Sequence, residues 1–149
     1  MDTIKLKVRG FHCDVYRVVN HARYVEFMEE ATWDYWDRRP EVVRTLMKNK
    51  VDHSVVNMNI DFRRSARLGD VLRIETQLAR AGHQSITFEQ KIWMDNTDEL
   101  VADAELTAVF FKADTGEKQP AASPVFKDWL ELNTLLGNDG KGFDTERTA

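Results

Sequence analysis

The sequence has very little cysteine and proline and no long hydrophobic run. Its 149 residues include 1 Cys and 3 Pro. A single cysteine excludes an internal disulfide, so nothing indicates an oxidising compartment. The longest purely apolar stretches cover only a few residues, whereas a helix that crosses a bilayer needs roughly 20. The first ten residues alternate polar and apolar side chains and lack a signal-peptide core. The sequence therefore predicts a soluble cytoplasmic protein without a membrane span.

An excess of basic charge is also missing. Lys and Arg total 21 against 25 Asp and Glu, for a net charge of −4. Because nucleic-acid-binding domains are usually clearly basic, we expect no nucleic-acid partner, although a local basic patch for a small anionic ligand is still possible.

The length fits one domain, which we assign to residues 1–136. Residues 137–149 hold three Gly and few apolar residues, so they are expected to form a disordered tail.

Hydrophobic periodicity predicts one strand, two helices and then four more strands. Residues 3–9 alternate, as a half-buried strand does. From His21 the apolar residues recur at helical spacing, and Asn20 is a suitable N-cap. A shorter helix begins at Pro40, and another is expected near Ser123. Four alternating runs joined by short polar turns indicate an antiparallel meander: residues 56–62, 72–78, 86–94 and 102–110. A sheet curled around the long helix buries both apolar faces, so the fold class is α+β.

The segment between the first strand and the long helix carries most of the candidate chemistry. It places Asp14 shortly before the N-terminus of the helix that begins at His21. Such a terminus presents unpaired N–H groups and the positive end of the helix dipole. These groups can polarise a carbonyl and stabilise the oxyanion that develops from it. Asp14 could then act as a general base toward water or as a nucleophile. The simpler alternative is that Asp14 only caps a turn.

Two other kinds of site compete in this segment. His12, Cys13, Asp14 and His21 are all types of metal ligand, but their spacing matches no paired CxxC or HExxH motif. Cys13 and His21 could also form a nucleophilic pair, although a lone cysteine is more often a small buried hydrophobe. We therefore predict neither a metal nor a cofactor.

Residues from the first strand to the last share their spacing with a known family. Tyr24 follows Asp14 by ten residues, with Val19-Asn20 between them, and Glu30-Ala31 comes next. This pattern resembles the hotdog-fold acyl-CoA thioesterases of the 4-hydroxybenzoyl-CoA type. The similarity is greatest to the bacterial long-chain acyl-CoA thioesterase III branch and is collinear over roughly residues 4–115. It includes Val8-Arg9-Gly10, His12, Asp14-Val15-Tyr16, Ala22-Arg23-Tyr24, Asn57, Asn59-Ile60, Arg63-Arg64 and Val101-Ala102-Asp103-Ala104.

The resemblance implies a fold and a set of roles. The fold is a five- or six-stranded antiparallel sheet around a long central helix, paired into homodimers or tetramers with the active site at the interface. Asp14 is the implied catalytic carboxylate, and backbone N–H groups near His21, Ala22 and Arg23 are implied to bind the thioester oxygen. Positions implied to contact the acyl-CoA substrate are Tyr16, Asn20 and Tyr24.

Two residues depart from the branch pattern, which has His where this chain has Val18 and Asn where it has His21. Histidine at the position of His21 is common in the related short-chain and aromatic branch. His21 could thus help to place water or substrate; alternatively, it is an exposed residue of the first helical turn. We predict hydrolysis of medium- to long-chain fatty acyl-CoA. The alternatives are an acyl-carrier-protein or aromatic acyl-CoA thioesterase, or a non-catalytic acyl-CoA-binding protein.

The densest cationic group is Arg63, Arg64 and Arg67. A net-negative protein that binds a CoA ester needs local positive charge for the phosphates, and guanidinium groups suit phosphate oxygens. We therefore predict that these three residues bind the CoA phosphates. The alternative is that they form a solvated strand end, in which case Lys5, Lys7 and Arg9 are the next candidates.

Overall fold

The computed structural model describes residues 1–81 and 84–118, and its order of elements confirms the predicted one. The helix expected near Ser123 and the tail at residues 137–149 lie outside the described residues. The elements are β1 (Asp2–Lys7), a short 3-10 helix η1 (Gly10–His12), α1 (His21–Asp37), α2 (Pro40–Lys48), β2 (Val51–Phe62), β3 (Val71–Ala81), β4 (Ser85–Met94) and β5 (Leu100–Lys112).

The two helices begin where the local sequence favours a start. Asn20 Oδ1 accepts a hydrogen bond from the Ala22 N–H at 3.0 Å, which confirms the predicted N-cap of α1. Pro40 is the first residue of α2, where a missing N–H leaves no hydrogen bond unmade. Both helix starts were therefore predictable from single residues.

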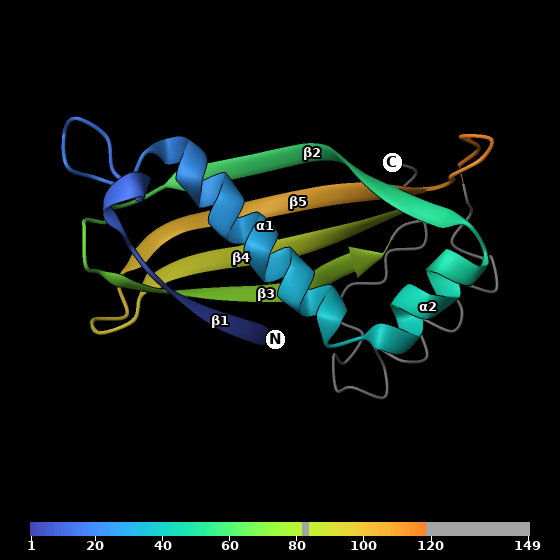
Figure 1. Ribbon diagram of the computed structural model, residues 1–149, viewed down its shortest axis with the longest axis horizontal. Coiled ribbons are helices and arrows are strands. Elements are labelled where there is room, and N and C mark those ends of the chain that lie inside the picture. Colours follow the sequence, from blue (N-terminus) through green and yellow to red (C-terminus); the bar gives the residue numbers. More distant parts are fainter. Residues whose placement is uncertain (82–83, 119–149) are drawn as a thin grey trace. The chain divides into compact units, whose positions relative to one another are not determined.

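The five strands form one sheet in the order β1-β3-β4-β5-β2, so β1 and β2 are its edges (Figure 1). β1 pairs antiparallel with β3, with Ile4 opposite Ile74 and Leu6 opposite Leu72. Short connections join β3 to β4 and β4 to β5, as antiparallel neighbours require. The predicted antiparallel sheet is confirmed, with five strands.

The described chain divides into two compact units. Unit 1 comprises Met1–Tyr35, Asn59–Gln77 and Glu89–Glu105, and unit 2 comprises Trp36–Met58 together with the described residues of 78–88 and 106–118. Each of the strands β2 to β5 contributes residues to both units.

In unit 1, α1 lies across one face of the sheet (Figure 1). Its buried residues include Met28, which is fully inaccessible to solvent, and the helix covers a buried polar contact with β4. Gln90 Nε2 donates to the Met28 carbonyl oxygen at 2.8 Å and lies 3.1 Å from both Thr32 Oγ1 and Thr76 Oγ1. The expected covering of the sheet by the long helix is therefore confirmed within this unit.

Unit 2 has its own apolar interior. Val42 and Leu46 form the buried side of α2. Trp36 packs edge-on against Phe88, with ring centroids 5.9 Å apart, and both side chains are at most 5% exposed. Aromatic edge-to-face pairs of this kind stabilise a core beyond the area that they bury.

β2 is more exposed than the sequence predicts. Its alternating residues Val56, Met58, Ile60 and Phe62 suggest a face buried on the protein's own helix. Instead, Val56 is 58% exposed and Phe62 is 51% exposed, and no residue from 52 to 62 is buried. Alternation reveals which side chains share a face, but not what covers that face. Among the strands within residues 1–81 and 84–118, β2 is an edge strand with a neighbour on one side only.

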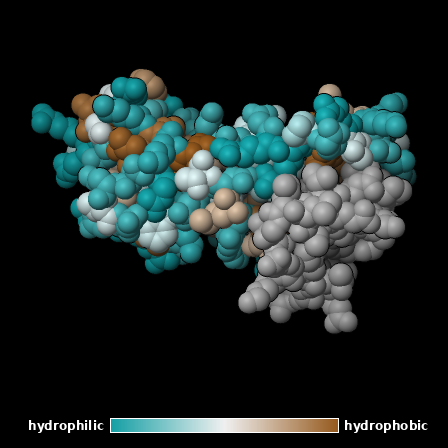
Figure 2. Space-filling view, turned by 90° about the horizontal axis from the view of Figure 1, so that it is seen from below, coloured by the Kyte–Doolittle hydropathy of each residue, from teal (hydrophilic) through white to brown (hydrophobic). Residues whose placement is uncertain are grey.

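One face of the described residues is largely polar. Most of the face shown in Figure 2 is hydrophilic, and hydrophobic residues form a limited band in its left half. This agrees with a composition in which 31% of residues are charged. Neither helix in the described ranges is long and apolar enough to cross a membrane.

Candidate active site

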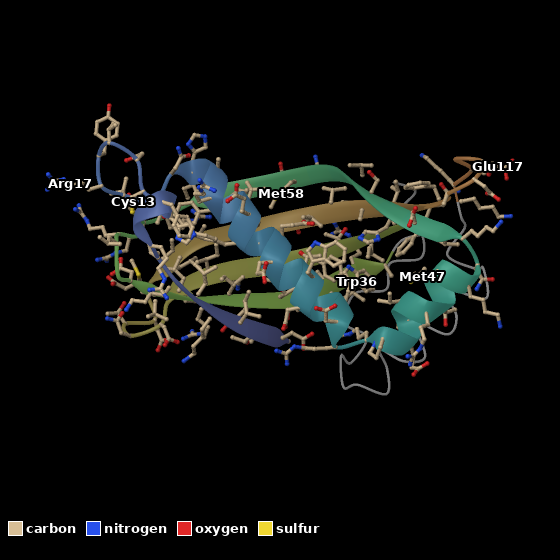
Figure 3. The ribbon with its side chains drawn as sticks, viewed as in Figure 1. Cys13, Arg17, Trp36, Met47, Met58 and Glu117 are labelled. Carbon is tan, nitrogen blue, oxygen red and sulfur yellow. The ribbon has the colours of Figure 1, made fainter. Side chains whose placement is uncertain are left out.

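A tight hairpin, residues 13–19, holds Asp14 between η1 and α1. Cys13 and Val19 form an antiparallel bridge at its base, and the Asp14 N–H donates to the Val18 carbonyl oxygen at 2.9 Å. Arg17 closes the turn in the left-handed region, with φ of 61°, and its N–H donates to the Asp14 carbonyl oxygen at 3.0 Å. Figure 3 shows Cys13 at the base of this Asp14 hairpin and Arg17 toward its outer end.

The Asp14 carboxylate is held in the turn by one of its oxygens. Oδ1 accepts a hydrogen bond from the Tyr16 N–H at 2.8 Å, which is the geometry of an Asx turn. Within residues 1–81 and 84–118, the other oxygen, Oδ2, has no hydrogen-bond partner. The turn-capping interpretation is thus correct for Oδ1. The same contact orients the carboxylate and leaves Oδ2 available to accept a proton.

The N-terminus of α1 offers fewer free donors than the sequence suggests. Asn20 Oδ1 accepts the Ala22 N–H, and the Asn20 carbonyl oxygen accepts the Arg23 N–H at 2.9 Å. In the described part of the chain, the His21 N–H has no acceptor. Of the three predicted oxyanion donors, only the His21 N–H is therefore free. The His21 side chain is exposed, and its ring centroid lies 6.4 Å from that of Phe62.

The three predicted substrate-contact residues lie in different environments. Tyr16 is 80% exposed near the tip of the Asp14 hairpin. Asn20 is engaged as the N-cap of α1. Tyr24 is only 4% exposed, and its hydroxyl accepts a hydrogen bond from the Ala66 N–H at 3.1 Å. Burial raises the pKa of the Tyr24 hydroxyl. The structure thus gives Asn20 and Tyr24 structural contacts and leaves Tyr16 open to solvent.

The arginine cluster is split by nearby carboxylates. Arg63 pairs with Asp103 at 2.8 Å and with Asp61 at 3.1 Å, and the hydrogen bond that Arg63 donates to Asp103 raises the pKa of Arg63. Arg64 forms an ion pair with Glu99. Asp103 lies on β5 and Glu99 in the loop before it, far from the arginines in sequence, so the cluster of basic residues in the sequence did not reveal that they are neutralised.

Arg67 is the member of the cluster whose guanidinium has no ion pair among the described residues. It is exposed, and its backbone bridges to Val18 of the Asp14 hairpin. The next hairpin residue, Arg17, is also exposed. Positive charge without a carboxylate partner therefore lies beside the Asp14 hairpin, and Arg17 is a residue that the sequence reasoning missed.

His12 is the other residue whose role the sequence reasoning missed, because it was considered only as a possible metal ligand and as part of the family pattern. It is 8% exposed, and its Nδ1 accepts the Arg9 N–H at 2.9 Å. Burial lowers the pKa of His12, and the positive charge of Arg23 lowers it further. His12 also lines a pocket of about 360 Å³ between β1 and α1, with Ile4, Lys5, Leu6, Glu26, Phe27, Glu30 and Asp34.

The contacts of Cys13 support neither a metal site nor a nucleophilic pair with His21. Its Sγ lies 3.7 Å from the Arg9 carbonyl oxygen, and no hydrogen bond within the described ranges links it to His21. Among the described residues, no three His, Cys, Asp or Glu side chains come together as a metal site would require.

Comparison with known proteins gives one consistent answer. The family model of the thioesterase-like superfamily matches residues 8–130. The long-chain acyl-CoA thioesterase FadM of Escherichia coli (strain K12) is 41% identical over 105 residues, which cover 70% of this chain and 79% of FadM. The acyl-CoA thioesterase YbgC of Haemophilus influenzae is 33% identical over 108 residues, 72% of this chain and 76% of YbgC.

Solved structures agree with the sequence relatives. YbaW from Escherichia coli superposes with a TM-score of 0.75 at 34% identity, covering 87% of this chain and 96% of YbaW. SAV2348 from Staphylococcus aureus, solved in complex with CoA, has a TM-score of 0.76 at 10% identity, covering 87% of this chain and 81% of its own. The second likeness concerns the fold alone.

The lowered pKa of His12 predicts how stability depends on pH. Its ordinary value is 6.5, so just below pH 6.5 the unfolded chain binds a proton that the folded chain does not. The free energy of unfolding should therefore fall as the pH drops below 6.5 toward the folded pKa, by at most about 1.4 kcal/mol per pH unit from this residue. Urea unfolding of the wild type and of His12→Asn at a series of pH values below 6.5 measures this change in the free energy of unfolding. Equal pH slopes in both proteins would contradict the prediction.

Proposed function

Because this chain belongs to the thioesterase-like superfamily and is an acyl-CoA thioester hydrolase, we propose that it cleaves medium- to long-chain fatty acyl-CoA with Asp14 as the general base. The family match over residues 8–130 and the 41% identity to a long-chain acyl-CoA thioesterase support the substrate class. The observation that supports the mechanism is that the hairpin holding the Asp14 carboxylate is joined at its base to Asn20, directly before the His21 N–H, which has no acceptor among the described residues.

The proposed reaction uses these two groups in turn. Asp14 Oδ2 takes a proton from a water molecule while the water oxygen bonds to the thioester carbon. The carbonyl oxygen becomes an oxyanion, which the His21 N–H and the helix dipole stabilise. Collapse of this intermediate breaks the carbon–sulfur bond, and the proton held by Asp14 passes to the departing sulfur. The products are a free fatty acid and CoA, and the carboxylate is restored.

A covalent route uses the same carboxylate. Asp14 then attacks the thioester carbon directly, CoA leaves, and water hydrolyses the acyl-aspartyl anhydride. Hydrolysis in ¹⁸O-labelled water, in a single turnover with enzyme in excess, separates the routes. The covalent route transfers one labelled atom to Asp14 when water attacks the aspartyl carbonyl, whereas the general-base route leaves Asp14 unlabelled.

The decisive substitution is Asp14→Asn. The amide keeps an oxygen for the Tyr16 N–H and so preserves the turn, but it removes the base. We expect kcat to fall by about 100-fold or more, the upper range of general-base catalysis. Thiol release from fatty acyl-CoA of several chain lengths, an aromatic acyl-CoA and an acyl-carrier-protein ester measures kcat and the substrate class together.

The matched control is Glu105→Gln, which neutralises an exposed carboxylate of unit 1 outside the site. It should keep the activity of the wild type. A folded Asp14→Asn variant that also keeps it would remove Asp14 from the mechanism. Binding of the ester without any thiol release by the wild type would instead favour the non-catalytic binding protein.

Phosphate binding should depend on Arg67 rather than on its two neighbours. Arg63 and Arg64 are already paired with carboxylates, whereas the Arg67 guanidinium is available. We expect Arg67→Gln to raise KM by roughly 5- to 30-fold, equivalent to about 1–2 kcal/mol for a hydrogen bond to a charged group. The kcat value should change little, because the contact is equal in ground and transition states. Steady-state kinetics at low and high salt tests this, since screening weakens exposed contacts.

Arg63→Gln and Arg64→Gln are the matched controls and should leave KM near the wild-type value. If Arg67→Gln leaves KM unchanged, the phosphate site lies elsewhere, with Lys7 and Arg9 as the next candidates, because Lys5 of the same group is paired with Asp95 at 3.0 Å. If the two controls raise KM as much as Arg67→Gln does, the absence of a carboxylate partner does not determine which arginine binds the phosphates.

A symmetric dimer should form through β2. Among the described strands, β2 pairs with β5 alone, and it carries the exposed apolar residues Val55 and Val56, at 47% and 58%. Two copies pairing edge to edge satisfy both features. We expect light scattering to give a dimer or a tetramer. Val56→Lys should dissociate it and lower activity, while Met47→Lys, at an exposed site on α2, should do neither. A fully active monomer would contradict this.

A further inference from the structure

The main chain of His12 closes the Asp14 hairpin. His12 precedes the hairpin and Asn20 follows it, and the Asn20 N–H donates to the His12 carbonyl oxygen at 2.9 Å. The Cys13–Val19 bridge comes next along the two arms. Asn20 is also the N-cap that leaves the His21 N–H free. Asn20 therefore joins the Asp14 hairpin to the start of α1, where the His21 N–H lies.

The side chain of His12 fastens this junction to the rest of unit 1. Nδ1 accepts the Arg9 N–H at 2.9 Å, so in the neutral ring the proton sits on Nε2. The ring packs edge-on against Phe27 of α1, with centroids 4.9 Å apart, and against Phe11 at 4.2 Å. Phe27 is itself only 3% exposed. The imidazole thus ties the start of η1 to the buried face of α1.

We propose that His12 is a positioning residue for thioester hydrolysis, which keeps the Asp14 carboxylate at a fixed distance from the free His21 N–H. The inference rests on the proposed function, because it assigns His12 no contact with substrate. Catalytic groups work only when neighbouring packing and hydrogen bonds hold them near their productive geometry. A misplacement of about 1 Å is able to cost about 100-fold in rate.

The expected signature is a change in kcat rather than in KM. His12 acts on the relative position of a base and an oxyanion donor, and both matter most in the transition state. Arg67, which is proposed to bind the phosphates, has no contact with the His12 side chain among the described residues, and its N–H donates to Asp70 Oδ2 at 2.8 Å, so we expect it to stay in place. We therefore expect His12→Leu to lower kcat by about 10- to 100-fold and to leave KM within about twofold.

Protonation gives a second signature. The charged groups that act on the ring are Arg9, Arg23 and Glu26, and the pocket that it lines also holds Lys5, Glu30 and Asp34. Burial and Arg23 keep the ring neutral near pH 7 by lowering its pKa. A proton on Nδ1 would face the Arg9 N–H and break the hydrogen bond. The kcat value of the wild type should therefore fall in mildly acidic solution.

His12→Asn separates this role from simple packing. The amide oxygen of Asn is able to accept the Arg9 N–H near the position of Nδ1, and it does not titrate in this range. His12→Asn should therefore keep most of kcat at about pH 8 and lose less of it in acid than the wild type does. His12→Leu should be slow at every pH.

The experiment measures kcat and KM for one long-chain acyl-CoA with the wild type, His12→Asn and His12→Leu from about pH 5 to about pH 9. Thermal unfolding of each protein shows that it is folded. Thr87→Val is the stability control, because it removes the hydroxyl of buried Thr87, which lies 3.1 Å from that of half-buried Thr107 in unit 2, and Thr87 has no part in the site. It should lower the unfolding temperature and leave kcat unchanged.

Three results would overturn the inference: wild-type kcat in folded His12→Leu, equal losses of kcat in both His12 variants, or the same acidic fall of kcat in His12→Asn as in the wild type. If His12→Leu does not fold, the comparison of His12→Asn with the wild type decides alone. The Asp14→Asn variant distinguishes a failure of the proposed function from a failure of the positioning role of His12. Full activity in that variant refutes the proposed base, whereas its loss beside an unaffected His12→Leu refutes only the positioning role.

Discussion

The site depends on an imbalance of hydrogen-bonding groups at the start of α1. A helix N-terminus has N–H groups that no preceding turn can accept, and they must find other partners or stay open. Asn20 accepts two of them, through its side chain and through its carbonyl oxygen, and the His21 N–H stays open. The proposed mechanism pairs this open donor with the Asp14 carboxylate of the preceding hairpin, whose Oδ2 is also unpaired among the described residues.

How far the sequence predicts this structure depends on the range of the interactions. Contacts within a few residues were predictable: the N-cap at Asn20, the helix start at Pro40, and the strands that follow from alternation. The partner of Arg63 was not, because Asp103 lies 40 positions away on a strand whose register no local pattern fixes. The exposure of β2 was missed for a related reason, since alternation assigns side chains to a face without naming the neighbour that covers it.

The electrostatics of the site follow from which charges are neutralised. Arg63 and Arg64 look like the strongest anion-binding group when counted along the chain, yet carboxylates from other elements occupy both. Arg67 is a single cation, but it bridges to the hairpin that carries Arg17. A chain with a net charge of −4 is thus able to present local positive potential where the phosphates of a CoA ester are proposed to lie. Free charge, rather than charge density, determines where an anion is attracted.

The buried amide of Gln90 has a consequence for the whole length of α1. Its Nε2 donates to the carbonyl oxygen of Met28, which lies seven residues, or about two helical turns, beyond His21. If α1 slid along its axis by one turn, about 5.4 Å, a carbonyl oxygen of the neighbouring turn would replace that of Met28, but Gln90 Nε2 would lose the hydroxyl of Thr32, the single Ser or Thr of α1. The contacts of Gln90 therefore fix the position of α1 along its own axis relative to β4. A contact near the middle of α1 thus determines how far the His21 end of the helix extends toward the Asp14 hairpin.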